Sequence, residues 1–163
     1  MAPVGPADQR PVELSNAVLV YTSEALRSDL FVAGELELVL YAMTSAKDTD
    51  WTVKVCDVHP SEESINVQET IWRASYVRGG APRLLPPNEV AEFVIPIGSL
   101  CHVFLQGHRI RVEFSSSNFP HWDRNLNTGN PLGMDALSDR VVATQTVLRE
   151  RGFASRLVLP TVQ

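Results

Sequence analysis

The chain has 163 residues, of which 44% are hydrophobic and 20% charged, as is typical of one globular domain rather than a disordered segment. Its formal net charge is -5, and its 14 basic residues form no run of lysine or arginine, which argues against nucleic acid or an anionic membrane as the main partner. No apolar stretch approaches the roughly 20 residues of a membrane-spanning helix. Residues 1–10 lack the apolar centre of a signal peptide.

Cys56 and Cys101 are the two cysteines of the chain, and both lie in strand-like segments. One disulfide between them is possible, but two cysteines do not make a disulfide scaffold. Two buried thiols in a cytoplasmic protein is the simpler interpretation, because reduced cysteines are the rule in that compartment. We therefore expect a cytoplasmic location.

Residues 1–14 form an arm that contains three prolines and Gly5. Proline removes backbone donors and fixes its own torsion, so this arm is predicted to be an extended linker. It suggests either that the chain was cut from a longer protein or that the arm contacts another domain. The folded domain is then expected to occupy residues 15–163.

Beyond the arm, most segments alternate between apolar and polar residues. The clearest runs from Leu36 to Ala42, where every second residue is apolar, as in a strand with one buried face. We expect strands at 17–22, 36–42, 51–56, 65–77, 93–97, 103–105, 107–114, 141–148 and 156–162.

The connections between these strands are rich in glycine, proline and polar residues. Gly34 indicates a turn or bulge, Pro96 indicates a strand end or an edge strand, and residues 78–88 read as a crossover loop. Only residues 23–27 and 133–140 could form a helical turn or two. Eight or nine strands with long crossovers predict an all-β fold, an antiparallel β-sandwich with Greek-key or jelly-roll connections.

The strand at 107–114 leads into a long polar loop, residues 118–129, where a sandwich often carries its recognition surface. Phe119 and Trp122 in this loop are expected to anchor it to the sandwich rather than to form a sugar-stacking platform. His108, at the start of the strand, is expected to order a turn through a hydrogen bond to a backbone group.

The pattern Asp123-x-Asn125-x-Asn127 places side-chain oxygens at alternate positions, as at the start of a calcium loop. The pattern then departs from that loop, because Thr128 stands where glycine is needed and Met134 where the bidentate glutamate is needed. Asx turns, in which these short side chains bond to nearby backbone, are the favoured interpretation over calcium.

Signals for catalysis or a bound metal are weak. There is no G-x-S-x-G elbow, and serines 115–117 lie at a strand end, where hydroxyls usually satisfy backbone groups. Cys56 and His59 are spaced as C-x-x-H, but Cys101 and His102 are adjacent on a strand and face opposite sides, which argues against a zinc site. We expect no catalytic residue, cofactor or metal in this chain.

Six segments, in this order, carry a resemblance to a known family: 18–23, 29–34, 48–58, 107–111, 115–129 and 155–160. The most specific are the D-T-D-W run at 48–51, the G-H-R-I-R strand at 107–111, and the loop S-N-F-P…D-R-N-x-N-T-G at 117–129. They resemble the C-terminal domain of the X-Pro dipeptidyl-peptidase / cocaine esterase / glutaryl-7-aminocephalosporanic acid acylase family of serine hydrolases. The resemblance covers about residues 6–162, and residues 5–10 resemble the segment that leaves the hydrolase domain.

The resemblance implies a jelly-roll sandwich of the galactose-binding-domain-like type. It also implies parent enzymes that cleave esters or amides with a Ser-His-Asp triad in a preceding α/β-hydrolase domain, and none of that triad maps onto this chain. The domain would pack on the catalytic domain, help to wall the substrate cleft and take part in oligomer contacts. By itself it would be inactive.

Eight residues are candidates for loop structure and interdomain contact: His108, Asn118, Phe119, Trp122, Asp123, Arg124, Asn125 and Asn127. The Ser-Glu-Glu-Ser run at 61–64 departs from the glycine-containing hairpin usual among relatives, which leaves the turn type there unspecified. A carbohydrate-binding module is the alternative function, for which Trp122, Phe119 and Tyr76 are the candidate aromatic residues.

Overall fold

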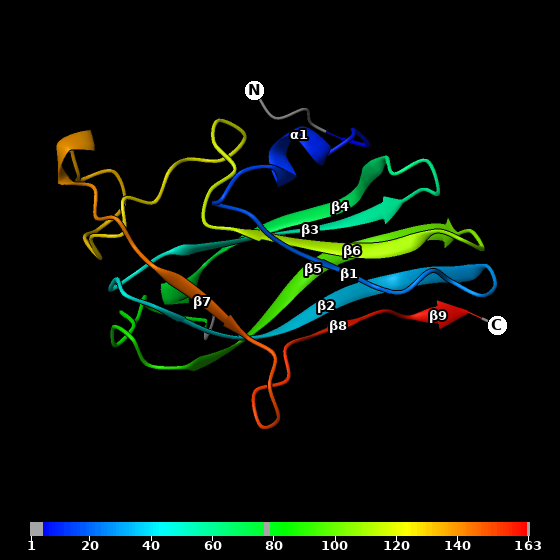
Figure 1. Ribbon diagram of the computed structural model, residues 1–163. Coiled ribbons are helices and arrows are strands. Elements are labelled where there is room, and N and C mark those ends of the chain that lie inside the picture. The colour runs from blue at the N-terminus through cyan, green and yellow to red at the C-terminus, as the bar shows by residue number, and fades with distance from the viewer. Residues whose placement is uncertain (1–4, 77–78, 163) are drawn as a thin grey trace.

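The computed structural model describes residues 5–76 and 79–162, which form an all-β sandwich of two antiparallel sheets (Figure 1). The strands are β1 (Leu19–Thr22), β2 (Leu30–Thr44), β3 (Asp50–Val58), β4 (Ser64–Arg73), β5 (Ala91–Phe104), β6 (Arg109–Ser115), β7 (Gln145–Leu148), β8 (Arg156–Val158) and β9 (Thr161–Val162). The helical elements are α1 (Arg10–Glu13), η1 (Ala74–Tyr76) and η2 (Leu137–Asp139). The predicted all-β class is confirmed, and the galactose-binding-like jelly roll stays a prediction.

The first sheet has the strand order β1-β6-β3-β4. The second sheet is centred on β2, which pairs with β5 along one edge and with β7, β8 and β9 in turn along the other. Since β6 lies between β1 and β3, the strand that leads into the loop at 118–129 is an inner strand of its sheet. The chain passes repeatedly from one sheet to the other, which is why long connections join many of the strands.

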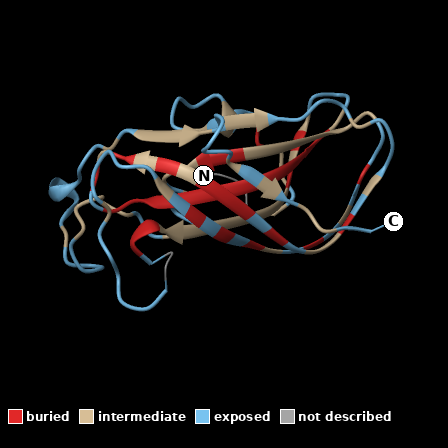
Figure 2. Ribbon diagram, turned by 90° about the horizontal axis from the view of Figure 1, so that it is seen from below, coloured by how far each residue is buried: buried red, intermediate tan, exposed pale blue. Residues whose placement is uncertain are grey.

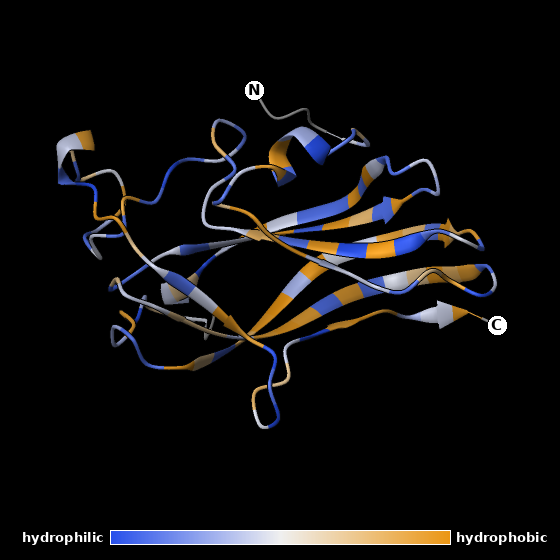
Figure 3. Cartoon of the chain, viewed as in Figure 1, coloured by the Kyte–Doolittle hydropathy of each residue, from blue (hydrophilic) through white to orange (hydrophobic). Residues whose placement is uncertain are grey.

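The core lies between the two sheets and follows the two-residue period of the strands. In β2, Leu36, Leu38 and Leu40 are at most 1% exposed, as their alternation predicts, and hydrophobic and hydrophilic residues alternate visibly along this strand (Figure 3). From the first sheet, Trp51 packs against Phe93 of the second, with ring centroids 5.7 Å apart. The buried residues form a band along the strands, while the loops at either end are exposed (Figure 2).

The arm differs from the extended linker predicted for residues 1–14, of which residues 1–4 lie outside the described ranges. Asp8 bridges to the edge strand β4, Gln9 is fully buried, and the helix α1 follows. Pro11 does not prevent this helix, because the first turn of a helix needs no backbone donor from its proline. The arm therefore packs on the outer face of the first sheet (Figure 1).

β2 and β5 extend furthest beyond the predicted strands. β2 continues through Gly34 without a turn, and β5 joins the short strands expected at 93–97 and 103–105. Within the described chain β5 pairs only with β2, so Pro96 does lie in an edge strand, where proline is tolerated. β4 ends earlier than expected, at Arg73, and Val77 of the predicted strand lies outside the described residues.

The last third of the chain is less regular than predicted. Residues 23–27 form no helix, and within 133–140 only the single 3₁₀ turn η2 is present. The strand expected at 156–162 is divided into β8 and β9 around Pro160, because proline cannot donate to the ladder. β7 is shorter than the strand expected at 141–148, because Val141 donates its backbone N–H to the loop carbonyl of Leu126 instead of to a strand.

Both cysteines are free, but only Cys56 is buried. The expectation of two buried thiols is therefore wrong for Cys101. Its neighbour in β5, Leu100, faces the core, so the alternation of the strand turns Cys101 outward. None of the helices in the described ranges has the length and apolarity required to cross a membrane.

Candidate functional site

The D-T-D run and the D-R-N motif of the long loop meet at one end of the sandwich. Asn125 Nδ2 donates hydrogen bonds to Asp48 Oδ2 at 3.2 Å and to Asp50 Oδ1 at 2.9 Å. Asp48 Oδ1 also accepts the backbone N–H of Ser75 at 3.0 Å. Both carboxylates are buried, so these bonds offset the high cost of removing charged groups from water.

Arg73, the last residue of β4, supplies the positive charge at this end. It lies opposite Asp50 in the register of β3 and β4, which brings the two side chains together. Its Nε donates to Asp50 Oδ1 at 2.9 Å and its Nη2 to Asp50 Oδ2 at 3.3 Å, a two-bonded fork. Arg73 Nη2 also lies 3.6 Å from Asp123 Oδ2, so one guanidinium links the sheet to the loop.

Asn127 holds the second half of the loop. Its backbone N–H donates to Asn125 Oδ1 at 2.9 Å, which is an Asx turn. Its φ is +62°, a left-handed conformation that asparagine adopts more readily than most residues. Its Nδ2 donates to the carbonyl of Val141 at 2.9 Å. The side chains of Asp123, Asn125 and Asn127 thus have different partners and do not converge on one point, as calcium ligands would.

Phe119 does not anchor the loop as predicted, because its side chain is 55% exposed. The Arg124 guanidinium lies 4.6 Å from its ring centroid, a cation–π contact. Trp122 is half-buried and meets the ring of His121 edge-on. The loop is fastened instead by Asn118, whose Nδ2 donates to a Glu69 carboxylate at 3.2 Å. The expected apolar anchor is therefore wrong for Phe119.

A cleft of about 510 Å³ opens beside the loop. Arg73, Tyr76 and Leu84 line one part of it, and the loop from Asp123 onward lines the rest. Two of its charged lining residues, Arg73 and Asp123, pair with each other at 3.6 Å.

His108 lies at the opposite end of the sandwich. Its Nδ1 is 2.8 Å from Asp57 Oδ1, so its partner is a carboxylate and not the predicted backbone group. His102 Nε2 lies 3.0 Å from the other oxygen of the same aspartate. Asp57 was missed by the sequence reasoning, although a charged residue between the apolar residues of a strand can signal a buried partner. The eight candidate residues therefore do not form one site.

Sequence reasoning also missed a layer of charged residues on the outer face of the first sheet. Lys54 is 5% exposed, and its Nζ donates to Gln9 Oε1 at 2.7 Å and lies 3.8 Å from a Glu69 oxygen. In β3 it stands opposite Glu69 on one side and Glu113 on the other. The arm covers this layer, which is why β3 is buried on both faces.

Glu113 is the most perturbed acid of this layer. It is 3% exposed, and its pKa is raised to about 7, chiefly because burial penalises the charged form. Glu13 nearby raises it further, while the thiol of Cys56, 3.2 Å away, donates to it and lowers it. Burial raises the pKa of the Cys56 thiol as well, so this thiol stays protonated as the donor.

We expect the stability of the domain to decrease as pH rises from about 4.5 to about 7. Over this window the folded state keeps the Glu113 proton that the unfolded state has lost, so folding takes up a proton. The free-energy advantage of the wild type over Glu113→Gln should shrink by roughly 2–3 kcal/mol between pH 5 and pH 8. Carbon-13 titration of the Glu113 carboxyl should give a midpoint near 7. A midpoint in the ordinary range of glutamate would contradict this expectation.

The polar contacts at the two ends of the sandwich, around Asp50 and around Asp57, hold strands and loops together. Among residues 5–76 and 79–162, the hydrogen bonds of the histidine rings go to Asp57, and none joins a serine to a histidine. The part of the chain that the structure describes thus holds no assembled Ser-His-Asp arrangement. Fold and contacts together define an antiparallel β-sandwich domain whose polar clusters hold its strands and loops in place.

The sequence matches the family of X-Pro dipeptidyl-peptidase C-terminal non-catalytic domains over residues 5–158, and the chain belongs to this family. It is 38% identical over 160 residues to the cocaine esterase of Rhodococcus sp. (strain MB1 Bresler), a match that covers 98% of this chain and 28% of the esterase. It is 26% identical over 164 residues to a putative serine esterase of Mycobacterium tuberculosis (strain CDC 1551 / Oshkosh), covering 90% of this chain and 24% of that protein.

Solved structures give the same result. An aminopeptidase from a marine sediment Thaumarchaeota archaeon superposes with a TM-score of 0.93 at 32% identity, covering 97% of this chain and 28% of that one. An α-amino acid ester hydrolase superposes with a TM-score of 0.92 at 32% identity, covering 96% and 27%. The chain thus spans between 24% and 28% of the length of these relatives. The resemblance seen in the sequence is confirmed: in its homologues, this non-catalytic domain is a small part of a larger hydrolase.

Proposed function

We propose that the chain is the accessory domain of an ester- or amide-cleaving serine hydrolase and that it packs on the α/β-hydrolase domain through residues 118–142, here called the loop face. The position of the exposed apolar side chains carries this proposal. Seven large hydrophobic side chains of the described residues are more than half exposed, and five of them belong to the loop face: Phe119, Leu132, Met134, Leu137 and Val142. Apolar groups gathered in this way on a surface mark an interface.

The loop face is also held in place before any partner binds. Asn125 ties it to Asp48 and Asp50, and Asn127 ties its beginning to Val141 near its end. A preformed surface loses less conformational entropy on docking than a flexible loop. The long irregular loop is therefore suited to be a docking surface in spite of having little regular structure.

We further propose that the exposed pair of Phe119 and Arg124 contributes to the wall of the substrate cleft, and that contacts between domains of this kind support oligomers of the parent protein. The aromatic contacts do not favour the alternative of a carbohydrate-binding module. The ring of Phe119 is contacted by Arg124, and Trp122 is half-buried. A sugar platform requires aromatic faces that are open to solvent.

Two further expectations stay proposals. The free thiols of Cys56 and Cys101 support a cytoplasmic location, since an oxidising compartment favours disulfides. Residues 1–14 are proposed to be the route by which the chain leaves the hydrolase domain. The burial of Gln9 supports an arm that is fixed to the sandwich before residue 15.

A chimera tests the proposed docking. The matching 28% of the Rhodococcus cocaine esterase is replaced by this chain, and hydrolysis of a p-nitrophenyl ester is measured together with thermal unfolding. We expect an active chimera that loses activity and stability when Met134→Lys and Val142→Lys are introduced together. Val94→Lys, an exposed position on β5, is the matched control. If the two loop-face lysines lower activity and stability no more than Val94→Lys does, the loop face is not the interface.

The chain alone should self-associate through the same uncovered surface. Sedimentation velocity over a concentration series should show reversible dimers or larger species, because exposed apolar surface favours association. Met134→Lys with Val142→Lys should shift the chain to a monomer without lowering its unfolding temperature, since both side chains are at least 76% exposed. A wild type that stays monomeric at all concentrations would contradict this expectation.

A further inference from the structure

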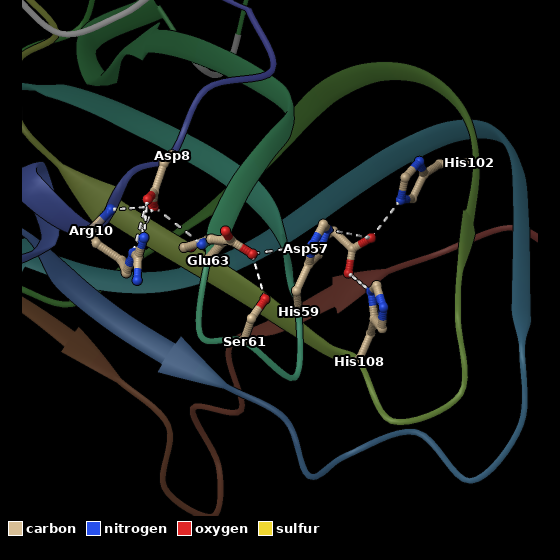
Figure 4. Close-up of polar contacts among 9 residues, drawn as sticks. Asp8, Arg10, Asp57, His59, Ser61, Glu63, His102 and His108 are labelled. Atoms are coloured by element: carbon tan, nitrogen blue, oxygen red, sulfur yellow. Dashed lines mark hydrogen bonds and ion pairs between the residues drawn. The ribbon is translucent and has the colours of Figure 1, made fainter.

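Three histidines surround one buried aspartate at the end of the sandwich away from the loop face (Figure 4). Asp57 lies near the end of β3, His59 follows it in the turn to β4, and His108 directly precedes β6. His102 belongs to β5 in the second sheet. The cluster therefore gathers residues that are distant in sequence, and the imidazoles of His59 and His108 lie with centroids 4.6 Å apart.

We propose that Asp57, His59 and His108 form a binding site for a divalent transition-metal ion of the zinc type. Each of the three offers one ligand atom, and these atoms all lie within 4.8 Å of one another. Tetrahedral zinc with bonds of about 2.0–2.2 Å needs its ligand atoms roughly 3.4 Å apart. To reach that spacing the 2.8 Å contact of His108 Nδ1 with Asp57 Oδ1 must lengthen and His59 must move closer from 3.9 Å. His59 can move because its side chain is 37% exposed and it stands at the start of the β3–β4 turn.

The surroundings supply the outer contacts that a metal site of this kind uses. His102 Nε2 lies 3.0 Å from Asp57 Oδ2 and can hold this oxygen while the other binds the ion. Glu63 Oε2 lies 3.7 Å from Nδ1 of His59, on the side of the ring away from Asp57. Carboxylates that bond to the second nitrogen of a ligating histidine orient its ring and increase its basicity. Water would complete the coordination.

The chemistry of the set selects the class of ion. Two imidazoles and one carboxylate suit zinc, cobalt or nickel, whereas calcium and magnesium require mostly oxygen ligands. A bound ion would join the β3–β4 turn to the chain that enters β6, and would thereby fix this end of the first sheet (Figure 1). The role of such an ion is structural, as in other sites that link separate segments of a small domain.

Calorimetric titration of the purified chain with ZnCl₂ tests the proposal. All variants carry Cys101→Ser, because the exposed thiol of Cys101 could bind zinc by itself. We expect one ion per chain, a higher unfolding temperature with zinc, and visible absorption bands of tetrahedral cobalt when Co²⁺ is used instead. His59→Gln should weaken zinc binding by at least about tenfold and abolish the cobalt bands.

His59→Gln should leave the metal-free chain as stable as before, since the His59 ring makes no direct hydrogen bond with the other described side chains. His121→Gln, which removes an equally exposed histidine elsewhere, is the matched control and should bind zinc like the parent. Absence of zinc binding, or binding that His59→Gln leaves unchanged, would overturn the proposal. Equal losses of zinc affinity in His59→Gln and His121→Gln would also overturn it, because they would show that zinc binds to scattered surface histidines.

Discussion

Replacing Asp50 by alanine should lower the free energy of unfolding by about 3 kcal/mol. The substitution removes the shared partner of Arg73 and Asn125, which donate to Asp50 at 2.9 Å each. Arg73 would keep only its 3.6 Å contact to the exposed Asp123, and Asn125 only its bonds to Asp48 and Asn127. Urea unfolding should report the loss of stability, and hydrogen exchange should show faster exchange across the loop at 118–129.

Asp123→Ala is the matched control for this change. It removes a carboxylate from the same arginine, but its side chain is 74% exposed, so the cost should stay within about 0.5 kcal/mol. Equal effects of Asp50→Ala and Asp123→Ala would contradict the view that the buried carboxylate fastens the loop to the sheet. So would an Asp50→Ala variant whose loop exchanges as slowly as that of the wild type.

Trp51→Ala should cost about 4 kcal/mol, the largest effect of a single substitution that we expect. Trp51 is 2% exposed and packs on Phe93 between the two sheets, so alanine leaves a large cavity. Thermal unfolding followed by circular dichroism should show a transition that is lowered by many degrees.

Trp51→Phe separates packing from polar effects. The indole Nε1 of Trp51 is buried and has no hydrogen-bond partner among the described residues. Phenylalanine removes this unpaired donor while it keeps most of the apolar contact, so we expect a loss of only about 1–2 kcal/mol. A Trp51→Phe variant as unstable as Trp51→Ala would show that the contact with Phe93 is not what this residue contributes.

Asp50 and Trp51 also show how far the sequence predicts the fold. Alternation of apolar residues identified the inward face of β2 and β3, because successive side chains of a strand always point to opposite faces of the sheet. It did not identify the charged outer face of β3 as buried. The burial of Lys54 depends on the arm folding back over the sheet, and no local pattern in residues 1–14 encodes that contact.

The parts of the candidate site that were predictable are those held by hydrogen bonds between residues close together in the sequence. The Asx turn at Asn125 follows from the chemistry of asparagine next to its own backbone. The partners of Asn125 and His108 are Asp50 and Asp57, which lie more than 50 residues away in sequence. They become neighbours only through the strand order, which the sequence alone does not give. Phe119 was misjudged because aromatic residues usually anchor loops, whereas here its ring stays exposed and is contacted by Arg124.

The metal proposal and the docking proposal concern opposite ends of the sandwich, so their tests are independent (Figure 1). A zinc-bound clamp at Asp57 would stabilise the end formed by the β3–β4 and β5–β6 connections. The loop face at the other end would remain free to contact a hydrolase domain. Failure of zinc binding would therefore leave the docking proposal unchanged. Failure of the docking test would likewise leave the zinc proposal unchanged.

The activity of the purified chain tests most directly whether this domain is non-catalytic. Its hydrolysis of a p-nitrophenyl ester and of an X-Pro anilide is measured beside a heat-inactivated sample, with a fluorophosphonate probe to label any reactive serine. We expect rates equal to those of the inactivated sample and no labelled serine. Saturable turnover that heating removes, together with a labelled serine, would contradict this expectation.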